Sequence, residues 1–359
     1  MSLAICAITQ GGAALARRLG LLLPEAEIWL PEKLRTADDC RYSAVGMATL
    51  LPQLFDRGHG LICIMATGIV VRSLAPQLRS KANDPAVVVL DEGGEFVISL
   101  LAGHLGGANA LARQVAALLG ATPVITTATD VNGLCAWDEA ARRAGLAVEP
   151  LERIRTLNSL LLQGEKIALV DPEGLIADKF ASVPGIALVA DFGAADKSGA
   201  AGRVFVTERL IPQLEQEENL LLLRPRCLVL GIGCNRHTSQ EEIAQAVEDV
   251  LNHAGLALLA VGRIATITEK GNETGLLAFA AELRLPLINY SCEELNSVRG
   301  PSPPSAYALA AVGAFGVCEP AALLAAEGGP LLIPKQKCGQ VTVAVARLST
   351  PPLSEDGRE

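Results

Sequence analysis

The chain has 359 residues, of which half are hydrophobic and only 3% aromatic, a composition typical of helices packed on sheets in two or three α/β domains. Its formal net charge of −9 argues against a general nucleic-acid-binding function, although local basic patches leave an anionic small molecule open as a ligand. The nine cysteines include no C-x-x-C pair, which predicts reduced thiols and no zinc site.

The N-terminal segment MSLAICAIT is a short apolar run without a basic flank, so it is interpreted as a first strand rather than as a signal peptide. The apolar run at 306–318 is too short to cross a bilayer. We therefore expect a soluble, cytoplasmic protein with no membrane partner.

The first region, residues 1–139, alternates short apolar runs with helical patterns. The runs LAICAIT, GLICIMA, AVVVLDE, FVISLLA and PVITTA predict strands, and a helix is expected at about residues 13–19. This alternation predicts a mostly parallel sheet with right-handed crossovers. Because ligands bind beyond the carboxyl ends of parallel strands, we expect four loops to meet at one edge: 66–72, 91–92, 103–109 and 126–130.

A glycine-rich loop follows the strand FVISLLA and precedes the helical pattern ALARQVAALLG. It holds His104 among Gly103, Gly106 and Gly107. Such a junction leaves the first N–H groups of the helix unpaired and favours an anion. The positive end of the helix dipole is expected to keep His104 neutral, which suits a general base. The pattern favours an enzyme for an anionic substrate; the alternative is a glycine-rich turn around a structural histidine.

The second region, residues 140–223, is short and rich in loops. Its apolar runs KIALV, GIALVA and GRVFVTE predict three strands, separated by turns that contain proline, glycine and aspartate. We interpret this region as a small inserted or bridging α/β domain.

The third region, residues 226–347, returns to strands that alternate with helices, and the tail at 348–359 is expected to be frayed. Ser239 and Glu242 form a capping-box pattern that sets the start of the first helix of this region. The whole chain is therefore predicted to form two three-layer, mostly parallel α/β domains joined by the small α/β middle domain.

The loop before that helix follows the strand CLVLGIG and carries Arg236, His237 and Thr238. It either holds a carboxylate or is a plain turn. Arg236 stands where a dinucleotide-binding fingerprint needs its third glycine, which argues against a Rossmann cofactor site.

Three charged residues of the third region have both a structural and a functional interpretation. Lys270 and Glu273 precede the helical pattern TGLLAFAAELR. The structural interpretation is capping by Asn272 or Thr274, with Glu273 in the first turn. Glu319 precedes a proline at another helix start, where an acid is also favourable. The functional interpretation of all three is proton transfer.

Several of these motifs, in chain order, resemble a known family. The runs IMATGIVVRSLAP, KANDPAVVVLDE and FVISLLAGHLGGANALARQVAALLGATPVITTATD resemble the N-terminal region of the CbiG family, the cobalt-precorrin-5A hydrolases of anaerobic cobalamin synthesis. The runs GIGCNRHTS, VCEPAALLAA and IPKQKCGQVTVAVAR resemble its C-terminal domain. The chain departs from the family pattern at Asn235 and His237, where a basic residue and a glycine are usual, and at Gly316, where a small polar residue is.

The resemblance implies a hydrolase that opens the ring A acetate δ-lactone of cobalt-precorrin-5A and releases acetaldehyde, which gives cobalt-precorrin-5B. It implies no cofactor, because the substrate carries the cobalt and its macrocycle serves as the electron sink. A cleft between the first and third regions would suit so large a ligand. The alternatives are a carrier of corrin intermediates and a nucleotide-binding protein. A homodimer and contacts with neighbouring enzymes of the pathway stay open.

Residue type and motif position, rather than the resemblance, suggest the roles of individual residues. His104 is the expected general base, with Asp130 as its orienting carboxylate or as the cap of a turn. The N–H groups of Gly106 and Gly107 are the expected oxyanion donors. His104 as an axial cobalt ligand is an alternative, and no protein metal site is expected. Lys270, Glu273 and Glu319 are candidates for a second proton transfer or for closing the site. The other candidates for substrate binding, whose basic members would face peripheral carboxylates, are Arg72, Lys81, Gly103, Asn109, Arg236, Thr238 and Lys335.

Overall fold

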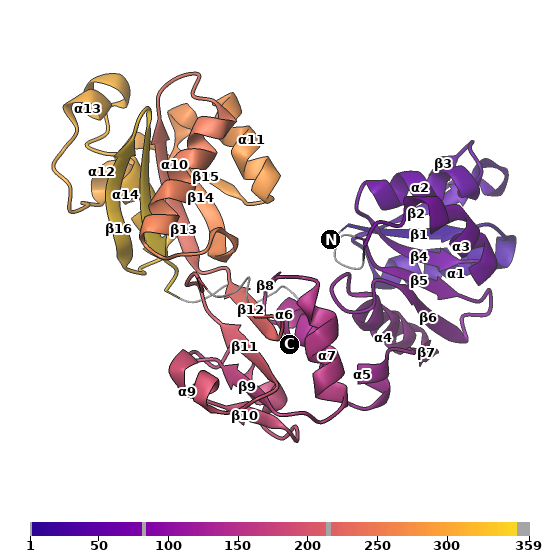
Figure 1. The fold of residues 1–359 in the computed structure, drawn as a ribbon. Coiled ribbons are helices and arrows are strands. Elements are labelled where there is room, and N and C mark those ends of the chain that lie inside the picture. The colour runs from indigo at the N-terminus through magenta and orange to yellow at the C-terminus, as the bar shows by residue number, and fades with distance from the viewer. Residues whose placement is uncertain (1, 81–83, 213–216, 350–359) are drawn as a thin grey trace. The chain divides into compact units, whose positions relative to one another are not determined.

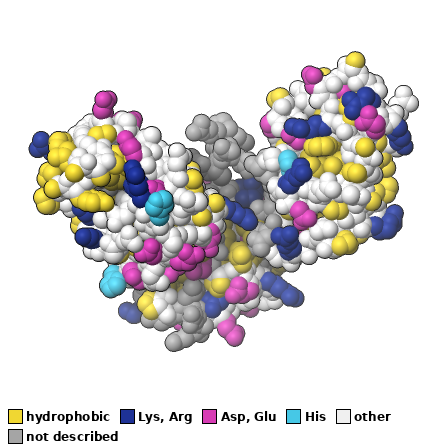
Figure 2. Space-filling view, turned by 90° about the horizontal axis from the view of Figure 1, so that it is seen from above, with side chains coloured by type: hydrophobic (Ala, Val, Ile, Leu, Met, Phe, Trp, Pro, Cys, Tyr) yellow, Lys and Arg dark blue, Asp and Glu magenta, His cyan; other side chains and the backbone are white. Residues whose placement is uncertain are grey.

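The computed structural model describes residues 2–80, 84–212 and 217–349 (Figure 1). The chain divides into two compact units, residues 1–142 with 158–164 and residues 143–157 with 165–359. The described residues form three separate sheets, mixed and mostly parallel, which confirms the predicted α/β fold class. Within the described ranges, no helix is both long and apolar enough to span a membrane. Basic and acidic side chains are interspersed on the face shown in Figure 2.

The first unit is built on a seven-stranded sheet with helices on both faces. In spatial order its strands are β3 (Arg41–Ser43), β2 (Ala26–Pro31), β1 (Leu3–Ala7), β4 (Gly60–Ile64), β5 (Val87–Leu90), β6 (Phe96–Leu101) and β7 (Thr122–Val124). Its helices are α1 (Gln10–Leu22), α2 (Met47–Asp56), α3 (Thr67–Leu74), α4 (Ala108–Leu119), α5 (Ala128–Val131) and α6 (Trp137–Arg143). Alternate residues of β1 divide between the faces, because Leu3 and Ile5 pack with α1 and α4, whereas Ala4 and Cys6 pack with α2 and α3.

The direction of β6 differs from the prediction. β5 and β6 pair antiparallel, and β7 runs parallel to β6, whereas the remaining strands run parallel to β5. The loops after β6 and β7 therefore lie at the edge opposite the carboxyl ends of β4 and β5. The expectation that four loops meet at one edge is wrong: 103–109 and 126–130 share one edge, and 66–72 and 91–92 follow strands that end at the other.

The second sheet has the strand order β10-β9-β11-β12-β8. Its strands are β8 (Leu146–Glu149), β9 (Ile167–Val170), β10 (Ile186–Leu188), β11 (Gly202–Val206) and β12 (Leu220–Pro225), and the same stretch of chain forms α7 (Arg153–Leu162), α8 (Ala177–Phe180) and α9 (Phe192–Lys197). The three predicted strands correspond to β9, β10 and β11. The sequence did not predict β12, because its leucine run fits a helix as well as a buried strand. β8 was also not predicted, and it pairs antiparallel with β12.

The third sheet has the order β15-β14-β13-β17-β16, with β13, β14 and β15 parallel and the last two strands antiparallel. Its strands are β13 (Leu228–Cys234), β14 (Val261–Ile267), β15 (Leu287–Tyr290), β16 (Leu331–Cys338) and β17 (Val341–Arg347), and its helices are α10 (Gln240–His253), α11 (Thr274–Leu283), α12 (Cys292–Ser297), α13 (Ala306–Val312) and α14 (Cys318–Ala325). Helices α10 and α11 pack on one face, and α12 and α14 on the other. The capping box predicted from Ser239 and Glu242 is present at the start of α10.

Candidate active site

The loop after β6 closes on itself before α4 begins. Gly107 has a φ of 86°, a left-handed conformation that glycine adopts without strain. The N–H groups at the start of the helix bond to carbonyl groups of the loop: Gly107 to His104 at 2.9 Å, Ala108 to Ala102 at 3.1 Å and Asn109 to Gly103 at 2.9 Å. The expectation of unpaired N–H groups, including the oxyanion role of Gly107, is therefore wrong for these three residues. The N–H of Gly106 has no hydrogen-bond partner among the described residues, so it remains the candidate oxyanion donor.

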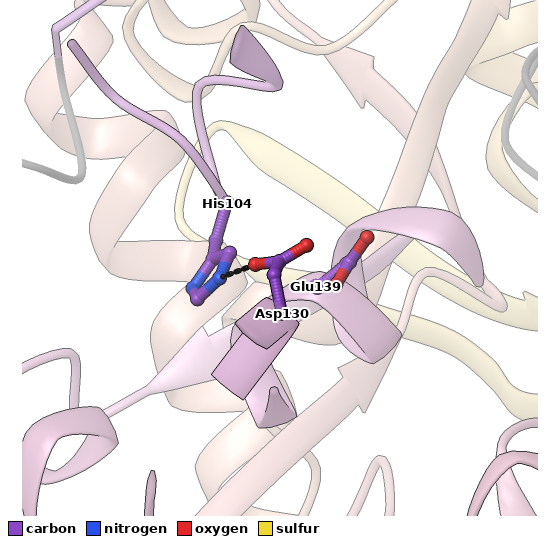
Figure 3. A group of neighbouring side chains, drawn as sticks. All are labelled: His104, Asp130 and Glu139. Carbon is purple, nitrogen blue, oxygen red and sulfur yellow. Dashed lines mark hydrogen bonds and ion pairs between the residues drawn. The ribbon is translucent and has the colours of Figure 1, made fainter. Parts of the chain in front are cut away.

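His104 lies between two carboxylates contributed by α5 and α6. Its Nε2 is 3.1 Å from Asp130 Oδ2, and its Nδ1 is 3.2 Å from Asp138 Oδ2. The side chains of His104, Asp130 and Asp138 are only 10%, 6% and 11% exposed. Figure 3 shows the imidazole directed toward Asp130, with Glu139 beside that carboxylate. Because ionised carboxylates only accept hydrogen bonds, both ring nitrogens donate, and this geometry favours the imidazolium form.

The pKa of His104 is raised above its ordinary value by this arrangement. Burial lowers the pKa, but the hydrogen bonds and charges of Asp138 and Asp130 outweigh that effect. A helix N-terminus typically contributes only about 0.3–1 kcal/mol, which is less than two adjacent carboxylates in a buried site can contribute. The pKa shift of His104 therefore runs opposite to the one predicted from the helix dipole. Both ring nitrogens are engaged by carboxylates, a geometry that suits proton donation better than abstraction of a proton from water.

Replacing Asp138 with asparagine is expected to lower the pKa of His104 toward its ordinary value of about 6.5, because the amide keeps the size of the side chain and removes its charge. The ring resonances of the four histidines can be followed by proton NMR against pH, with His104→Gln identifying the relevant signal. Asp178→Asn removes a surface carboxylate that pairs with Lys179 and serves as the control. An unchanged pKa in the Asp138 variant would contradict the paired-carboxylate explanation.

Asn109 connects the His104 loop by hydrogen bonds to β6 and to the loop and helix that follow β7. Its side chain is fully buried; Oδ1 accepts a hydrogen bond from Ser99, and Nδ2 donates to Thr127 and to Asp130. The structure therefore uses both polar atoms of an amide that was expected to bind substrate. Asn109 positions Asp130, and through it His104.

Arg113 and Glu139 complete the buried network. Arg113 forms an ion pair with Asp130 and lies 3.9 Å from Glu139. The ligand atoms of His104, Asp130 and Glu139 lie within 4.8 Å of one another, a donor set that could hold a divalent cation. The guanidinium of Arg113 and the charged ring of His104 already balance carboxylate charge at this position, so the network is explained as a set of ion pairs.

Two of the predicted binding residues lie elsewhere or outside the described ranges. Arg72 is an exposed residue of α3 that lines a shallow surface hollow with Pro52 and Pro76, and none of its described contacts reaches the His104 loop. Lys81 lies outside the described residues. Because the loop after β6 leaves the sheet at the opposite edge from the loop after β4, the sequence grouping of Arg72 with His104 does not correspond to a contact.

Of the predicted residues of the third region, Lys270 and Lys335 line a cavity of about 280 Å³. Glu273 is the residue directly before α11, and its side chain makes no capping hydrogen bond. Neither Asn272 nor Thr274 caps this helix, so the structural interpretation from the sequence is wrong. The Glu273 carboxylate instead accepts hydrogen bonds from the N–H of His237 and from Lys270, both at 3.0 Å. These two contacts lower the pKa of Glu273.

Glu319 is a buried carboxylate, only 4% exposed, beside the same cavity. It accepts hydrogen bonds from the N–H and the hydroxyl of Ser302, at 3.2 and 2.7 Å, and from the N–H of Lys335 at 2.8 Å. These bonds fasten the loop before α13 to β16. They fix the backbone that presents the Lys335 side chain to the cavity.

Comparisons with known proteins match three successive regions of the chain to three parts of one family. Family models described as cobalamin synthesis G N-terminal, cobalamin biosynthesis central region and cobalamin synthesis G C-terminus match residues 49–130, 135–225 and 228–346. A cobalt-precorrin-5A hydrolase of Priestia megaterium is 37% identical over 352 residues, covering 96% of this chain and 94% of that protein. The chain belongs to the CbiG family. A cobalt-precorrin-5A hydrolase of Salmonella typhimurium is also 37% identical, over 91% of this chain and 92% of its own length. A crystal structure of a cobalamin biosynthesis protein G homologue from Sulfolobus solfataricus aligns over 97% of both chains at 22% identity, with a TM-score of 0.36.

The loop before α10 contains one position at which this CbiG chain departs from the family pattern. His237 has a φ of 63°, so its backbone lies in the left-handed region where glycine is usual. Arg236 is exposed beside it, whereas Thr238 is buried and donates its hydroxyl proton to the carbonyl of Asn235 at 3.0 Å. Thr238 therefore holds the turn, and Arg236 is the loop residue left accessible to a ligand.

Replacing His237 with glycine is expected to raise the free energy of unfolding by about 1 kcal/mol, because glycine removes the left-handed strain and keeps the N–H that bonds to Glu273. The shift in the midpoint of urea unfolding measures it. Arg236→Gly at the neighbouring position has no such strain to remove and is expected to lower stability. A His237→Gly variant less stable than the parent chain would contradict the strain argument.

Asp138, Arg113 and Glu139 are site residues that the sequence did not reveal. Asp138 and Glu139 stand in CAWDEAARR, at the start of a helix, where acids are common for structural reasons alone. Their role depends on the tertiary placement of α6 against the His104 loop, which local sequence does not encode. Asp130, by contrast, was recognisable because it follows a predicted strand at the same edge.

Proposed function

We propose that this chain is a cobalt-precorrin-5A hydrolase that opens the ring A δ-lactone and releases acetaldehyde. The observation that carries the proposal is the 37% identity to two curated hydrolases of that name over more than nine tenths of each protein. The buried His104 network supports it, because hydrolysis of a lactone requires controlled proton transfer in a site that limits access of water.

The reaction has two stages that balance without a redox cofactor. Water adds to the lactone carbonyl, the ring C–O bond breaks, and the products are a carboxylate side chain, a free hydroxyl group and one proton, which passes to solvent. That hydroxyl then loses its proton, the carbon–carbon bond to the macrocycle breaks, and acetaldehyde leaves. The electron pair passes to the cobalt-bearing macrocycle, which takes up a proton. The protein supplies orientation and proton transfer, and the cobalt enters with the substrate.

We assign His104 a role in both stages. As an imidazolium it donates a proton to the departing lactone oxygen, and the neutral ring then recovers a proton from the freed hydroxyl. Asp130 and Asp138, which bond to the two ring nitrogens, stabilise the charged form between turnovers. The N–H of Gly106 binds the oxyanion that forms at the carbonyl.

Anaerobic incubation of the purified chain with cobalt-precorrin-5A tests the proposal. Acetaldehyde is expected in proportion to the substrate consumed, measured by its reduction with NADH and alcohol dehydrogenase. A heat-treated sample gives the background. Tight binding of the substrate without acetaldehyde would overturn the enzymatic function and favour a carrier of corrin intermediates.

A further inference from the structure

The cavity of the third sheet has a composition that the His104 network does not explain. It lies where the end of β13, helix α13 and strand β16 meet, and its volume is about 280 Å³. Its walls include Ile267, Val312 and Val317, so the interior is partly apolar. This volume lies just under the lower end of the range of about 300–1,000 Å³ that is usual for small-molecule pockets, so a tetrapyrrole can enter only by an edge or by its side chains.

The charged side chains that line the cavity are all lysines, although the chain as a whole carries a net charge of −9. Lys270 is neutralised by its ion pair with Glu273 at 3.0 Å. Lys335 and Lys337, on β16, form no side-chain hydrogen bond or ion pair with any described residue. Two uncompensated ammonium groups at the wall of one cavity favour carboxylate ligands.

Helix α13 adds an exposed apolar surface at the mouth of this cavity. Its sequence AYALAAV is almost wholly apolar, yet none of its residues is buried. Tyr307, which lines the cavity, is 71% exposed, and Leu309 is 48% exposed. Hydrophobic side chains gather at the far left of Figure 2, on the side where Figure 1 labels α13. An apolar helix that remains uncovered beside unpaired cations is typical of a binding surface.

We propose that this cavity and α13 form the docking site for the carboxylate-bearing edge of the tetrapyrrole substrate. Lys335 and Lys337 bind acetate or propionate carboxylates, and Tyr307 packs against the flat face of the macrocycle. Glu319 acts as a positioning residue, because it holds the backbone N–H of Lys335. This inference rests on the proposed function for the identity of the ligand.

The double variant Lys335→Gln/Lys337→Gln tests the site through steady-state release of acetaldehyde. We expect KM to rise by about tenfold or more, which corresponds to the loss of about 1.4 kcal/mol of binding, with the change in KM much larger than that in kcat. The matched control is Lys33→Gln/Lys179→Gln, which removes the same charge from residues that do not line the cavity. A KM equal to that of the parent chain would overturn the inference while leaving the hydrolase function intact.

A second measurement separates failure of the site from failure of the proposed function. Uroporphyrin, a stable tetrapyrrole with acetate and propionate side chains, serves as a fluorescent probe for binding. Tyr307→Ala is expected to weaken uroporphyrin binding several-fold, whereas Tyr307→Phe keeps the ring and the affinity. If the parent chain bound uroporphyrin in a lysine-dependent way but released no acetaldehyde, the site would stand and the hydrolase proposal would fall. Binding that is indifferent to both Tyr307 and the two lysines would overturn the site.

Discussion

Replacing His104 with glutamine is expected to lower acetaldehyde release at least about a hundredfold, because a positioned acid–base group typically contributes about 10²–10⁴ in rate. Glutamine keeps a hydrogen-bonding side chain of similar reach but has no proton that it can transfer near neutral pH. The measurement is the single-turnover rate with enzyme in excess, which separates chemistry from product release. A rate equal to that of the parent chain, in a folded His104→Gln protein, would remove His104 from the mechanism.

The pH dependence of stability gives an independent check on the charge of His104. The folded pKa lies above the unfolded value of about 6.5, since Asp138 and Asp130 outweigh the effect of burial. The contribution of the charged ring to the free energy of unfolding is therefore fully present below about pH 6.5 and is lost as the pH rises through the folded pKa. In the His104→Gln protein this component of the pH dependence should be absent. Urea unfolding midpoints of the two proteins across that interval measure the difference.

The second large effect, on the free energy of unfolding, is expected from replacing Glu319. Replacing it with alanine leaves the part-buried N–H groups of Ser302 and Lys335 without their acceptor. Each unsatisfied buried donor costs about 1–3 kcal/mol, so we expect the free energy of unfolding to fall by about 3 kcal/mol. Glu319→Gln keeps one acceptor oxygen and should lose about half as much.

The control for Glu319 is Glu248→Ala, an exposed substitution on α10 that should change stability by less than about 0.5 kcal/mol. Chemical denaturation followed by circular dichroism measures all three variants. If Glu319→Ala were as stable as Glu248→Ala, the three hydrogen bonds to Glu319 would not hold the loop to β16. The effect on the docking site would then have to be sought in the lysines alone.

The parts of the fold that depend on local sequence pattern were predictable, and those that depend on strand direction were not predicted. The glycine-rich junction around His104 marked a strand end and a helix start. The direction of β6 had a signal in DEGGE, a short linker with two glycines between apolar runs, which is typical of a hairpin. A hairpin predicted from this linker would have placed Arg72 and His104 at opposite edges of the sheet. Asp138 had no comparable signal, because its contact with His104 arises only when α6 packs beside the loop.

The hairpin between β5 and β6 also has a consequence for the order in which the first unit folds. The two strands are joined by a short turn, so they can pair within microseconds and with little loss of chain entropy. The pairing of β1 with β4 must instead wait until the intervening helices and strands have been brought together. The strand that leads into the His104 loop therefore belongs to the part of the sheet with the most local contacts. A mutation that weakens the hairpin turn should slow the appearance of the active site more than it changes the finished structure.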